Sequence, residues 1–243
     1  MGLPAGIPVR ARSGSLRVLT YNIQFCRGVD RVIDPVRIAA VIASFDPDVV
    51  ALQEVDVGCA RSGHRDQVEL LGTALGMQVA FGTALPLGTG QSGNATLSRL
   101  PIVRTHRITL PVRRSVHEPR CALVTRVGWH GCEVDIINIH LSDRSATDRL
   151  AQAELVIRST GDVPTVVCGD LNCTPWSEPF RTLARRLRPV ASPRSWPSPL
   201  PVIALDHILV RGLAAVRAGL WRGPGVRRAS DHLPVFAELT MHL

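Results

Sequence analysis

Short runs of apolar residues, many of them β-branched, recur along the chain and are separated by polar or turn-forming residues. Such runs predict β-strands. The eight runs are LRVLTYNI (16–23), DVVALQ (48–53), ATLSR (95–99), CALVTRVGW (121–129), EVDIINIHL (133–141), TVVCG (165–169), LDHILV (205–210) and LPVFAEL (233–239). His130 and Gly131 lie between two of these runs and predict a hairpin turn. Several runs are apolar on both faces, which indicates sheets covered on both sides.

Helical segments are fewer than strands. Three helices are predicted at residues 35–45, 66–75 and about 145–159. Asp34 is a suitable N-cap for the first helix, and Gly76 ends the second. The run RTLARRLR (181–188) is interpreted as the solvated face of a short helix, with a groove for a polyanion as the alternative. The proline-rich segment RPVASPRSWPSPLPV (188–202) is predicted to be an irregular surface loop.

Many strands and few helices favour an α/β fold in which sheets pack on each other beneath a cover of helices. The chain has 243 residues and no internal repeat or long linker, so we expect one domain over residues 15–243 after an N-terminal tail of residues 1–14. No apolar run reaches the ~18 residues of a membrane span. The first residues contain no apolar stretch of signal-peptide length, so we expect a cytoplasmic protein without a transmembrane segment.

The charge balance is basic, because 28 basic residues, all of them Arg, give a formal net charge of +8. Arg side chains match phosphate oxygens in a bidentate manner, which favours anionic partners. Biased codon usage explains an Arg-rich chain equally well. Nucleic acid is one such partner, although the few aromatic residues are not interleaved with basic ones as in stacking platforms. The six cysteines form no C-x-x-C pair, so we expect buried, reduced thiols.

Polar residues stand where the predicted strands begin or end. They are Asn22, Glu54, Asn138, His140, Asp170, Asn172, Asp206, Asp231 and His232. Residues two apart share one face of a strand, so Asn138 and His140 point the same way. Polar groups at the ends of buried strands can converge on one rim of the sheets, where α/β proteins bind their ligands.

Eight sequence blocks follow one another in an order that is typical of a known family. They are TYNI (20–23), LQEVD (52–56), SGNATLSRLP (92–101), EPRCAL (118–123), NIHL (138–141), CGDLN (168–172), WPSPLP with LDHILV (196–210) and SDHLPV (230–235). The chain resembles the endonuclease/exonuclease/phosphatase superfamily, in particular its short bacterial members. The resemblance implies a four-layer αββα sandwich, with two mixed β-sheets face to face and helices outside. It also implies divalent-metal-dependent hydrolysis of phosphate esters.

The resemblance assigns metal binding to three residues, Glu54, Asn22 and Asp231. Mg²⁺ prefers oxygen ligands and usually takes one or two carboxylates. Glu54 is therefore the strongest candidate ligand, with the amide oxygen of Asn22 beside it and Asp231 in or next to the coordination sphere. We expect Mn²⁺ to substitute for Mg²⁺, and the resemblance leaves one and two metal ions open.

Five residues are assigned to catalysis by the same resemblance. Asp170 and Asn172 match the pair that activates water and steadies the pentavalent phosphate; for these two alone, an Asx turn is the structural alternative. His232 is expected to contact the phosphate and exchange a proton while Asp206 holds its imidazole. His140 is expected to donate a hydrogen bond to a phosphate oxygen.

Supporting roles follow for a second group of residues. Three are expected to bind substrate phosphate, namely Asn94, Arg120 and Asn138. Glu118 is expected to orient His140, and His207 to point away from the site. Ser92 stands where the family usually has an aromatic residue, so the surroundings of the substrate differ there.

Two classes of function fit these observations. The first is a Mg²⁺-dependent hydrolase of phosphoric ester bonds, which covers phosphodiesterases, nucleases and hydrolases of lipid or small-molecule phosphates. The second is a catalytically silent module that binds a phosphate-bearing partner. The complete set of acidic and histidine residues favours the enzyme.

A dinucleotide site at GTGQSG (88–93) is rejected, because a β-prone segment with Pro101 follows in place of the required helix. Loops select the substrate, so the sequence determines neither the substrate nor the oligomeric state.

Overall fold

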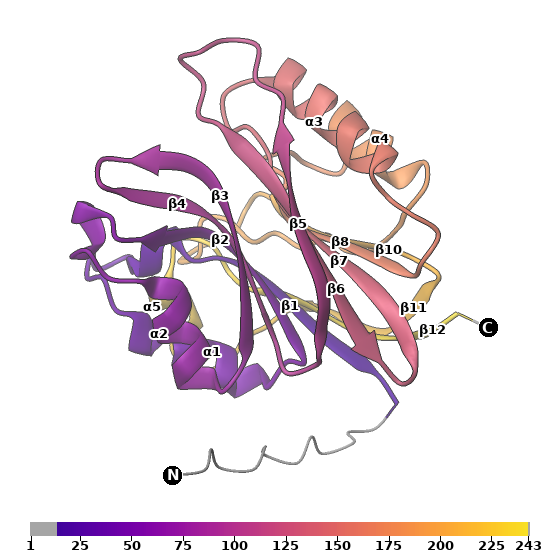
Figure 1. Cartoon of the computed structure of the whole chain (residues 1–243), viewed down its shortest axis with the longest axis horizontal. Coiled ribbons are helices and arrows are strands. Elements are labelled where there is room, and N and C mark those ends of the chain that lie inside the picture. Colours follow the sequence, from indigo (N-terminus) through magenta and orange to yellow (C-terminus); the bar gives the residue numbers. More distant parts are fainter. Residues whose placement is uncertain (1–13, 243) are drawn as a thin grey trace.

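Two β-sheets lie face to face, with helices on their outer sides (Figure 1). The computed structural model describes residues 14–242, so the predicted tail lies, apart from Gly14, outside the described residues. Each sheet has six strands and mixes parallel with antiparallel pairs. This arrangement confirms the predicted fold class. Within residues 14–242, no helix combines the length and the apolar character that crossing a membrane requires.

The strand order places the two parallel pairs inside the sheets. The first sheet contains, in spatial order, β11 (Leu213–Leu220), β12 (Val235–Met241), β1 (Leu16–Asn22), β2 (Val49–Val57), β4 (Gly90–Ser98) and β3 (Gln78–Leu87). The second contains β5 (Ile102–Leu110), β6 (Arg120–Trp129), β7 (Cys132–His140), β8 (Thr165–Asp170), β10 (Asp206–Arg211) and β9 (Arg188–Ala191). β1 runs parallel to β2, and β7 to β8. Each of these pairs is joined by a helical crossover, as parallel strands require.

The helices cover the two outer faces. They are α1 (Pro35–Phe45) and α2 (Gln67–Leu75) on the first sheet, α3 (Ala146–Arg158) and α4 (Glu178–Ala184) on the second, and the single turn α5 (Val226–Ala229) before β12. Two 3-10 turns, Gln24–Cys26 and Ala60–Ser62, follow β1 and β2. The side chains of Asp34, Asp66 and Ser145 accept the backbone N–H three residues ahead and fix the starts of α1, α2 and α3. The three predicted helices are confirmed.

Apolar side chains alternate between a central layer and two outer layers. In β1, Val18 lies in the central cluster between the sheets, whereas Leu19 lies in the cluster under α1 and α2. In β7, Ile136 is central and Ile137 lies under α3 and α4. Because side chains alternate along a strand, the position of each polar residue in its strand decides whether it faces the other sheet.

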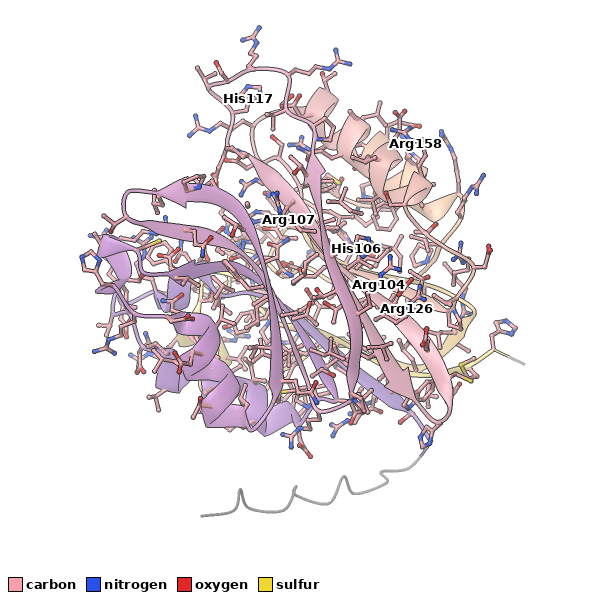
Figure 2. All side chains as sticks on the ribbon, viewed as in Figure 1. Arg104, His106, Arg107, His117, Arg126 and Arg158 are labelled. Atoms are coloured by element: carbon pink, nitrogen blue, oxygen red, sulfur yellow. The ribbon has the colours of Figure 1, made fainter. Side chains whose placement is uncertain are left out.

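The four strands that the apolar runs did not predict are β3, β5, β9 and β11, and each lies at an edge of its sheet. β5 illustrates the reason, since Arg104, His106 and Arg107 extend from it and are exposed (Figure 2). Such a strand is held by pairing on one side only, and its sequence has no apolar run. The predicted hairpin at His130 and Gly131 is confirmed between β6 and β7.

The proline-rich segment differs from the prediction of an irregular surface loop. Its first residues form β9, which pairs with β10. Ser195 and Ser198 are fully buried, and both form side-chain hydrogen bonds. The prediction was therefore wrong for these parts, because small polar side chains let a proline-rich segment enter the protein without losing hydrogen bonds.

Candidate active site

Four central strands bring polar residues to one end of the sandwich. Asn22 ends β1, His140 ends β7, Asp170 ends β8 and Asp206 begins β10. All four share the strand face that packs against the other sheet, because the apolar residues at even spacing before or after them belong to the central cluster. Asp170 pairs in register with His140 on one side and with Asp206 on the other. The predicted convergence on one rim is therefore present in the structure.

Glu54 reaches this end through a β-bulge. The sequence places it at the end of a strand, but β2 continues to Val57. Gln53 and Glu54 together oppose one residue of β4, Asn94, and Glu54 has a left-handed backbone with φ of 55°. Without the bulge, Glu54 would share the helix side of the sheet with Leu52. A bulge re-aims a side chain in this way, and left-handed backbone at a residue other than glycine is strained.

Asn22 connects two carboxylates at the centre of the site. Its side-chain nitrogen donates to Glu54 Oε1 at 3.0 Å and to Asp170 Oδ2 at 3.1 Å. Its amide oxygen accepts from the backbone N–H of Gln24 at 3.1 Å. In this arrangement Asn22 positions the two carboxylates, and it presents oxygen to a metal only if the amide turns over. Its assignment as a metal ligand stays a prediction.

Both carboxylates ionise less readily than usual. Burial raises the pKa of Glu54, and the negative charge of Asp231 adds to this effect. Burial also raises the pKa of Asp170 to about 7, with the charge of Asp206 adding to the shift and His232 opposing it. Burial is the largest cause of both shifts, and a metal cation bound between these oxygens would stabilise their charged forms.

His232 and Asp206 form a buried pair, although 26 residues separate them in sequence. Asp206 Oδ2 lies 2.8 Å from His232 Nδ1, and it also accepts from Ser195 Oγ at 2.5 Å. Burial alone would lower the pKa of His232, but the carboxylates of Asp206 and Asp170 outweigh it and raise this pKa to about 10. His232 is therefore an imidazolium at neutral pH, with Nε2 directed toward Asp170 at 3.7 Å.

His140 has the opposite protonation state. Its pKa is held well below the usual range, first by burial and then by the positive charges of Arg120 and His232. Arg120 Nη1 lies 3.4 Å from His140 Nδ1, and His140 Nε2 lies 3.6 Å from Asp170 Oδ2. Arg120 also donates to Glu118 at 3.0 Å. Glu118 was expected to orient His140; instead it holds Arg120, whose guanidinium lies against the imidazole.

Asp231 and Asn172 flank the central carboxylates. Asp231 is half-buried and accepts from the side-chain nitrogen of Gln24 at 3.1 Å. The backbone N–H of Asn172 donates to Asp170 Oδ1 at 2.9 Å, as an Asx turn requires, and its side chain donates to the carbonyl of Leu141. The Asx turn thus exists and fixes Asp170, whether or not Asn172 also contacts substrate.

Asn138 lies beneath the site and not in it. It is fully buried, donates to the carbonyls of Leu52 and Ala95, and accepts from Gln53 at 2.8 Å. These bonds tie the two sheets together and leave no free donor for a phosphate, so the structure does not support the predicted phosphate contact. Asn94 is nearly as buried and donates to two backbone carbonyls, but it borders the hollow described next.

A small hollow opens over the site and is lined by Glu54, Asn94, Glu118, Arg120 and His140 together with residues of β3 and β4. His207 points away, as predicted, with its Nε2 bonded to the carbonyl of Cys173 and its ring against Phe180 on the helix side.

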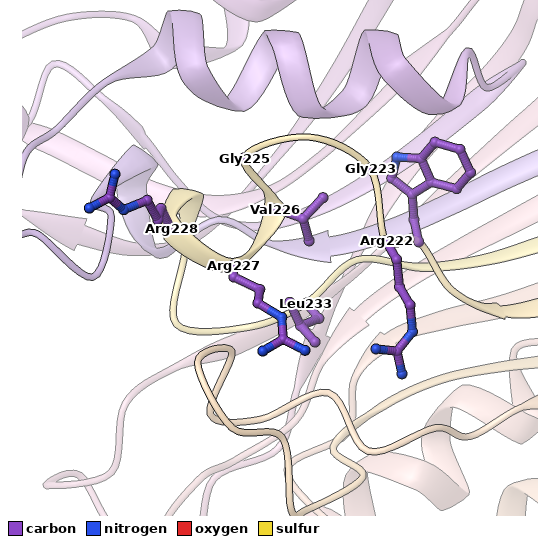
Figure 3. A pocket seen from close by; sticks show the side chains of 8 residues that line it. Arg222, Gly223, Gly225, Val226, Arg227, Arg228 and Leu233 are labelled. Atoms are coloured by element: carbon purple, nitrogen blue, oxygen red, sulfur yellow. The ribbon is translucent and has the colours of Figure 1, made fainter.

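A larger pocket, of about 390 Å³, lies next to α5 and contains none of the predicted site residues (Figure 3). Trp221, Val226 and Leu233 line its apolar part, and Arg222 and Arg227 extend beside it. Leu233 directly follows His232 in the chain, so this pocket borders the segment that carries the histidine.

The donor atoms suit a divalent metal ion. Glu54, Asp231 and Asp170 offer carboxylate oxygens, the ligands that Mg²⁺ prefers. A second group, Asp170, Asp206 and His232, has ligand atoms within 4.8 Å of one another. Within it, Asp206 Oδ1 is buried and has no hydrogen-bond partner among the described residues. His232 Nδ1 is already bonded to Asp206, so a cation here would compete with that hydrogen bond.

Two residues of the site were missed by sequence reasoning. Ser195 fixes Asp206 by donating to its carboxylate and accepting its backbone N–H at 3.2 Å. Gln24 fixes Asp231. Neither has a sequence signal of its own: Ser195 lies in the proline-rich segment, and Gln24 follows β1 in a turn with left-handed backbone.

The fold and the site together define the class of this protein: a four-layer α/β sandwich with an acidic, histidine-containing site at one end of both sheets. Comparison with known proteins then gives the family. A profile of the Endonuclease/Exonuclease/phosphatase family matches residues 19–232, and the chain belongs to this family. Members of the family are typically hydrolases that act on phosphoester bonds.

Individual relatives agree with this assignment. The uncharacterized protein YbhP of Escherichia coli (strain K12) is 29% identical over 262 residues, which cover 96% of this chain and 99% of YbhP. The crystal structure of an endonuclease/exonuclease/phosphatase from Beutenbergia cavernae superposes with a TM-score of 0.80 at 26% identity, over 94% of this chain and 72% of that one. A mannosyl-6-phosphatase from Bacteroides thetaiotaomicron has a TM-score of 0.74 at 20% identity, over 93% of this chain and all of that one, and shares the fold.

Proposed function

We propose that this protein is a divalent-metal-dependent phosphoesterase whose reaction takes place around Asp170. The observation that carries the proposal is the register of the second sheet, which puts Asp170 between His140 and Asp206. The contact between Asp206 and His232 Nδ1 holds the His232 ring next to Asp170. A carboxylate with a pKa of about 7 and a histidine with a pKa of about 10 form a base and an acid that are both in their active states near neutral pH.

Mg²⁺ is the proposed cofactor, with Mn²⁺ as a substitute. Glu54 and Asp231 would hold it through carboxylate oxygens, and Asn22 would assist. When bound, the ion supplies positive charge that polarises the phosphate and offsets the negative charge of the site. The buried carboxylates with raised pKa support a site of this kind.

The side chains divide the work of ester hydrolysis. Asp170 accepts a proton from the attacking water, whose oxygen forms the new bond to phosphorus. His232 donates the Nε2 proton to the departing ester oxygen as the bond from phosphorus to that oxygen breaks. Asp206 stabilises the imidazolium through Nδ1, and Ser195 positions Asp206. Asn172 steadies the phosphate next to Asp170.

Neutral His140 and the guanidinium of Arg120 are proposed to donate hydrogen bonds to the phosphate oxygens. Glu118 keeps Arg120 in place, and burial keeps His140 uncharged. Asn94 borders the same hollow and completes the proposed substrate contacts.

The proposal covers phosphomonoesters and phosphodiesters alike, and the structurally similar mannosyl-6-phosphatase supports a phosphate ester as the substrate class. A nucleic acid is an alternative substrate within this class, and we propose a cytoplasmic location. A catalytically silent binding module is the second candidate function, but it has no need for a carboxylate and a histidine whose pKa values are both raised.

The test is an activity panel of phosphomonoesters, phosphodiesters, nucleic acids and phospholipids with Mg²⁺ or Mn²⁺. We expect turnover that EDTA abolishes and that Glu54→Gln reduces by at least ~10², while circular dichroism shows an unchanged fold. Glu69→Gln, on the exposed surface of α2, makes the same substitution away from the site; it is the matched control and should leave turnover unchanged. Binding of phosphate esters without any turnover would favour the silent module, and full activity in excess EDTA would refute the metal requirement.

A further inference from the structure

We propose that a basic pocket next to the active site binds a second phosphate group of the substrate. The pocket has a volume of about 450 Å³ and lies between the loop that joins β5 to β6 and the start of α3. It is lined by Arg113, Arg114, His117, Arg144, Ser145, Ala146 and Thr147. We call it the basic pocket. His117 lies in the loop next to the start of α3 (Figure 2).

The loop is fixed in place by α3. Asp148, fully buried in the first turn of the helix, lies 2.6 Å from His117 Nδ1 and accepts the backbone N–H of Arg113 at 3.2 Å. Gln152 donates to the carbonyl of Pro111 at 2.9 Å. These contacts fix the loop backbone against α3. The positions from which the side chains of Arg113 and Arg114 extend are therefore fixed as well.

Positive charge dominates the lining. The side chains of Arg113 and Arg114 are exposed, and within residues 14–242 neither has a carboxylate partner or a side-chain hydrogen bond. Arg144 approaches one carboxylate, that of Asp143, at 3.7 Å. The charge of Asp148 is used beneath the pocket to hold His117. Unpaired guanidinium groups that share a concave surface suit a phosphate, whose oxygens accept their N–H groups in pairs.

The basic pocket and the active site are connected through Asp143. Asp143 lies between them: its carboxylate is 3.3 Å from Arg120 Nη2 in the active site and 3.7 Å from Arg144 Nε in the basic pocket. The loop makes the same connection, because His117 directly precedes Glu118, which holds Arg120. In the proposal, one substrate contacts both places, with its scissile phosphate at Arg120 and another phosphate among the pocket arginines.

This inference rests on the proposed function and narrows it. It predicts a phosphoester that carries at least one more phosphate close to the scissile one. A polynucleotide and a small molecule with several phosphates share this chemistry, and the kinetic experiment below separates them.

The binding experiment uses the whole chain in EDTA, where the proposed turnover is absent, and inorganic pyrophosphate as the probe. Isothermal titration calorimetry compares wild type with Arg113→Gln/Arg114→Gln, with Arg120→Gln for the active site, and with Arg185→Gln/Arg186→Gln. The last is an exposed adjacent pair that removes the same charge elsewhere. We expect the pocket variant to weaken binding at least ~10-fold, the effect of losing one charge-assisted hydrogen bond, and the control pair to change it less than twofold. Loss of binding in Arg120→Gln alone would overturn the inference.

The kinetic experiment compares substrates with one phosphate and with several. In the pocket variant we expect KM to rise at least ~10-fold for an oligonucleotide or for a small polyphosphorylated ester, whichever is the substrate. KM for a simple ester with a single phosphate should stay unchanged. An equal effect on both kinds of substrate would refute a second-phosphate site. A complete lack of turnover would refute the proposed function, whereas the pyrophosphate titration would still decide whether the basic pocket binds phosphate.

Discussion

Replacing Asp206 by Asn removes one charge from the buried contact between Asp206 and His232 and keeps the size of the side chain. In the wild type, Asp206 Oδ2 lies 2.8 Å from His232 Nδ1, and both residues are buried. Burial disfavours the imidazolium, and the carboxylates of Asp206 and Asp170 overcome this effect to raise the pKa of His232 to about 10. With Asn at position 206, the pKa of His232 must fall, and the histidine holds its proton less firmly.

The size of the effect follows from the kind of contact. A hydrogen bond to a charged group contributes about 1.5–3 kcal/mol, and loss of one acid–base group slows turnover ~10²–10⁴-fold. A factor of ten in rate corresponds to about 1.4 kcal/mol, so the hydrogen bond accounts for the lower part of that range. We expect kcat/KM to fall ~10²-fold in Asp206→Asn and at least as much in His232→Ala. The double variant should lose little more than His232→Ala, because both changes disable one proton donor.

The assay is a double-mutant cycle on kcat/KM, with His232 titrated by NMR in wild type and in Asp206→Asn. Proton donation by His232 requires its charged form, so activity should decline as the pH rises through the histidine pKa. This decline should begin at lower pH in Asp206→Asn. Strictly additive losses, together with an unchanged His232 titration, would refute the pairing as a functional unit and would leave Asp206 with a structural role only.

Three further predictions address other parts of the molecule. Asp170→Asn should lower kcat ~10²–10⁴-fold with little change in KM, and a higher KM at unchanged kcat would contradict its role as a base. In wild type, kcat/KM should rise with pH up to about 7, where Asp170 loses its proton. Ser195→Ala should lower kcat/KM about tenfold, the effect of one hydrogen bond to a charged group, and Ser195→Thr should restore part of the loss. Burial opposes ionisation of Asp148, but hydrogen bonds from His117 and Arg113 outweigh it and hold its pKa below the usual range. Asp148→Asn should therefore lower the free energy of unfolding by about 1–3 kcal/mol at pH 7; the difference should shrink as the pH falls through the lowered pKa, and urea unfolding at several pH values would show it.

The division between predicted and unpredicted strands has a physical cause. The eight central strands pair on both sides and are largely buried, so each contains a short run of apolar or β-branched residues that is visible in the sequence. The four edge strands pair with one neighbour and carry exposed side chains, such as those of Arg104 and His106 in β5. Each edge strand pairs with the strand that follows it in the chain, and it is this pairing, more than an apolar pattern of its own, that fixes it as a strand.

The candidate site was predictable to a similar degree. Asp170, His140 and Asp206 stand at strand ends, and simple alternation brings them together. The orientation of Glu54 depends on a β-bulge that no residue pattern predicts. Regular alternation of side chains along β2 would have turned Glu54 toward the helices. Ser195 enters the site through the folding of a proline-rich segment, which sequence reasoning assigned to the surface. Tertiary contacts fixed what local patterns left undetermined.

The pairing of β1 with both β2 and β12 has a consequence for biosynthesis. Ribosomes deliver the chain from its N-terminus at ~5–20 residues per second. Asn22 and Glu54 therefore emerge long before His232, and β1 has an open hydrogen-bonding edge until β12 arrives. An incomplete nascent chain lacks His232, so under the proposed mechanism it has no proton donor for the hydrolysis of phosphate esters. The pairing of β12 with β1 fills this edge of β1, and the segment directly before β12 brings His232 to Asp206, so the same step of folding would complete both the sheet interior and the proposed site.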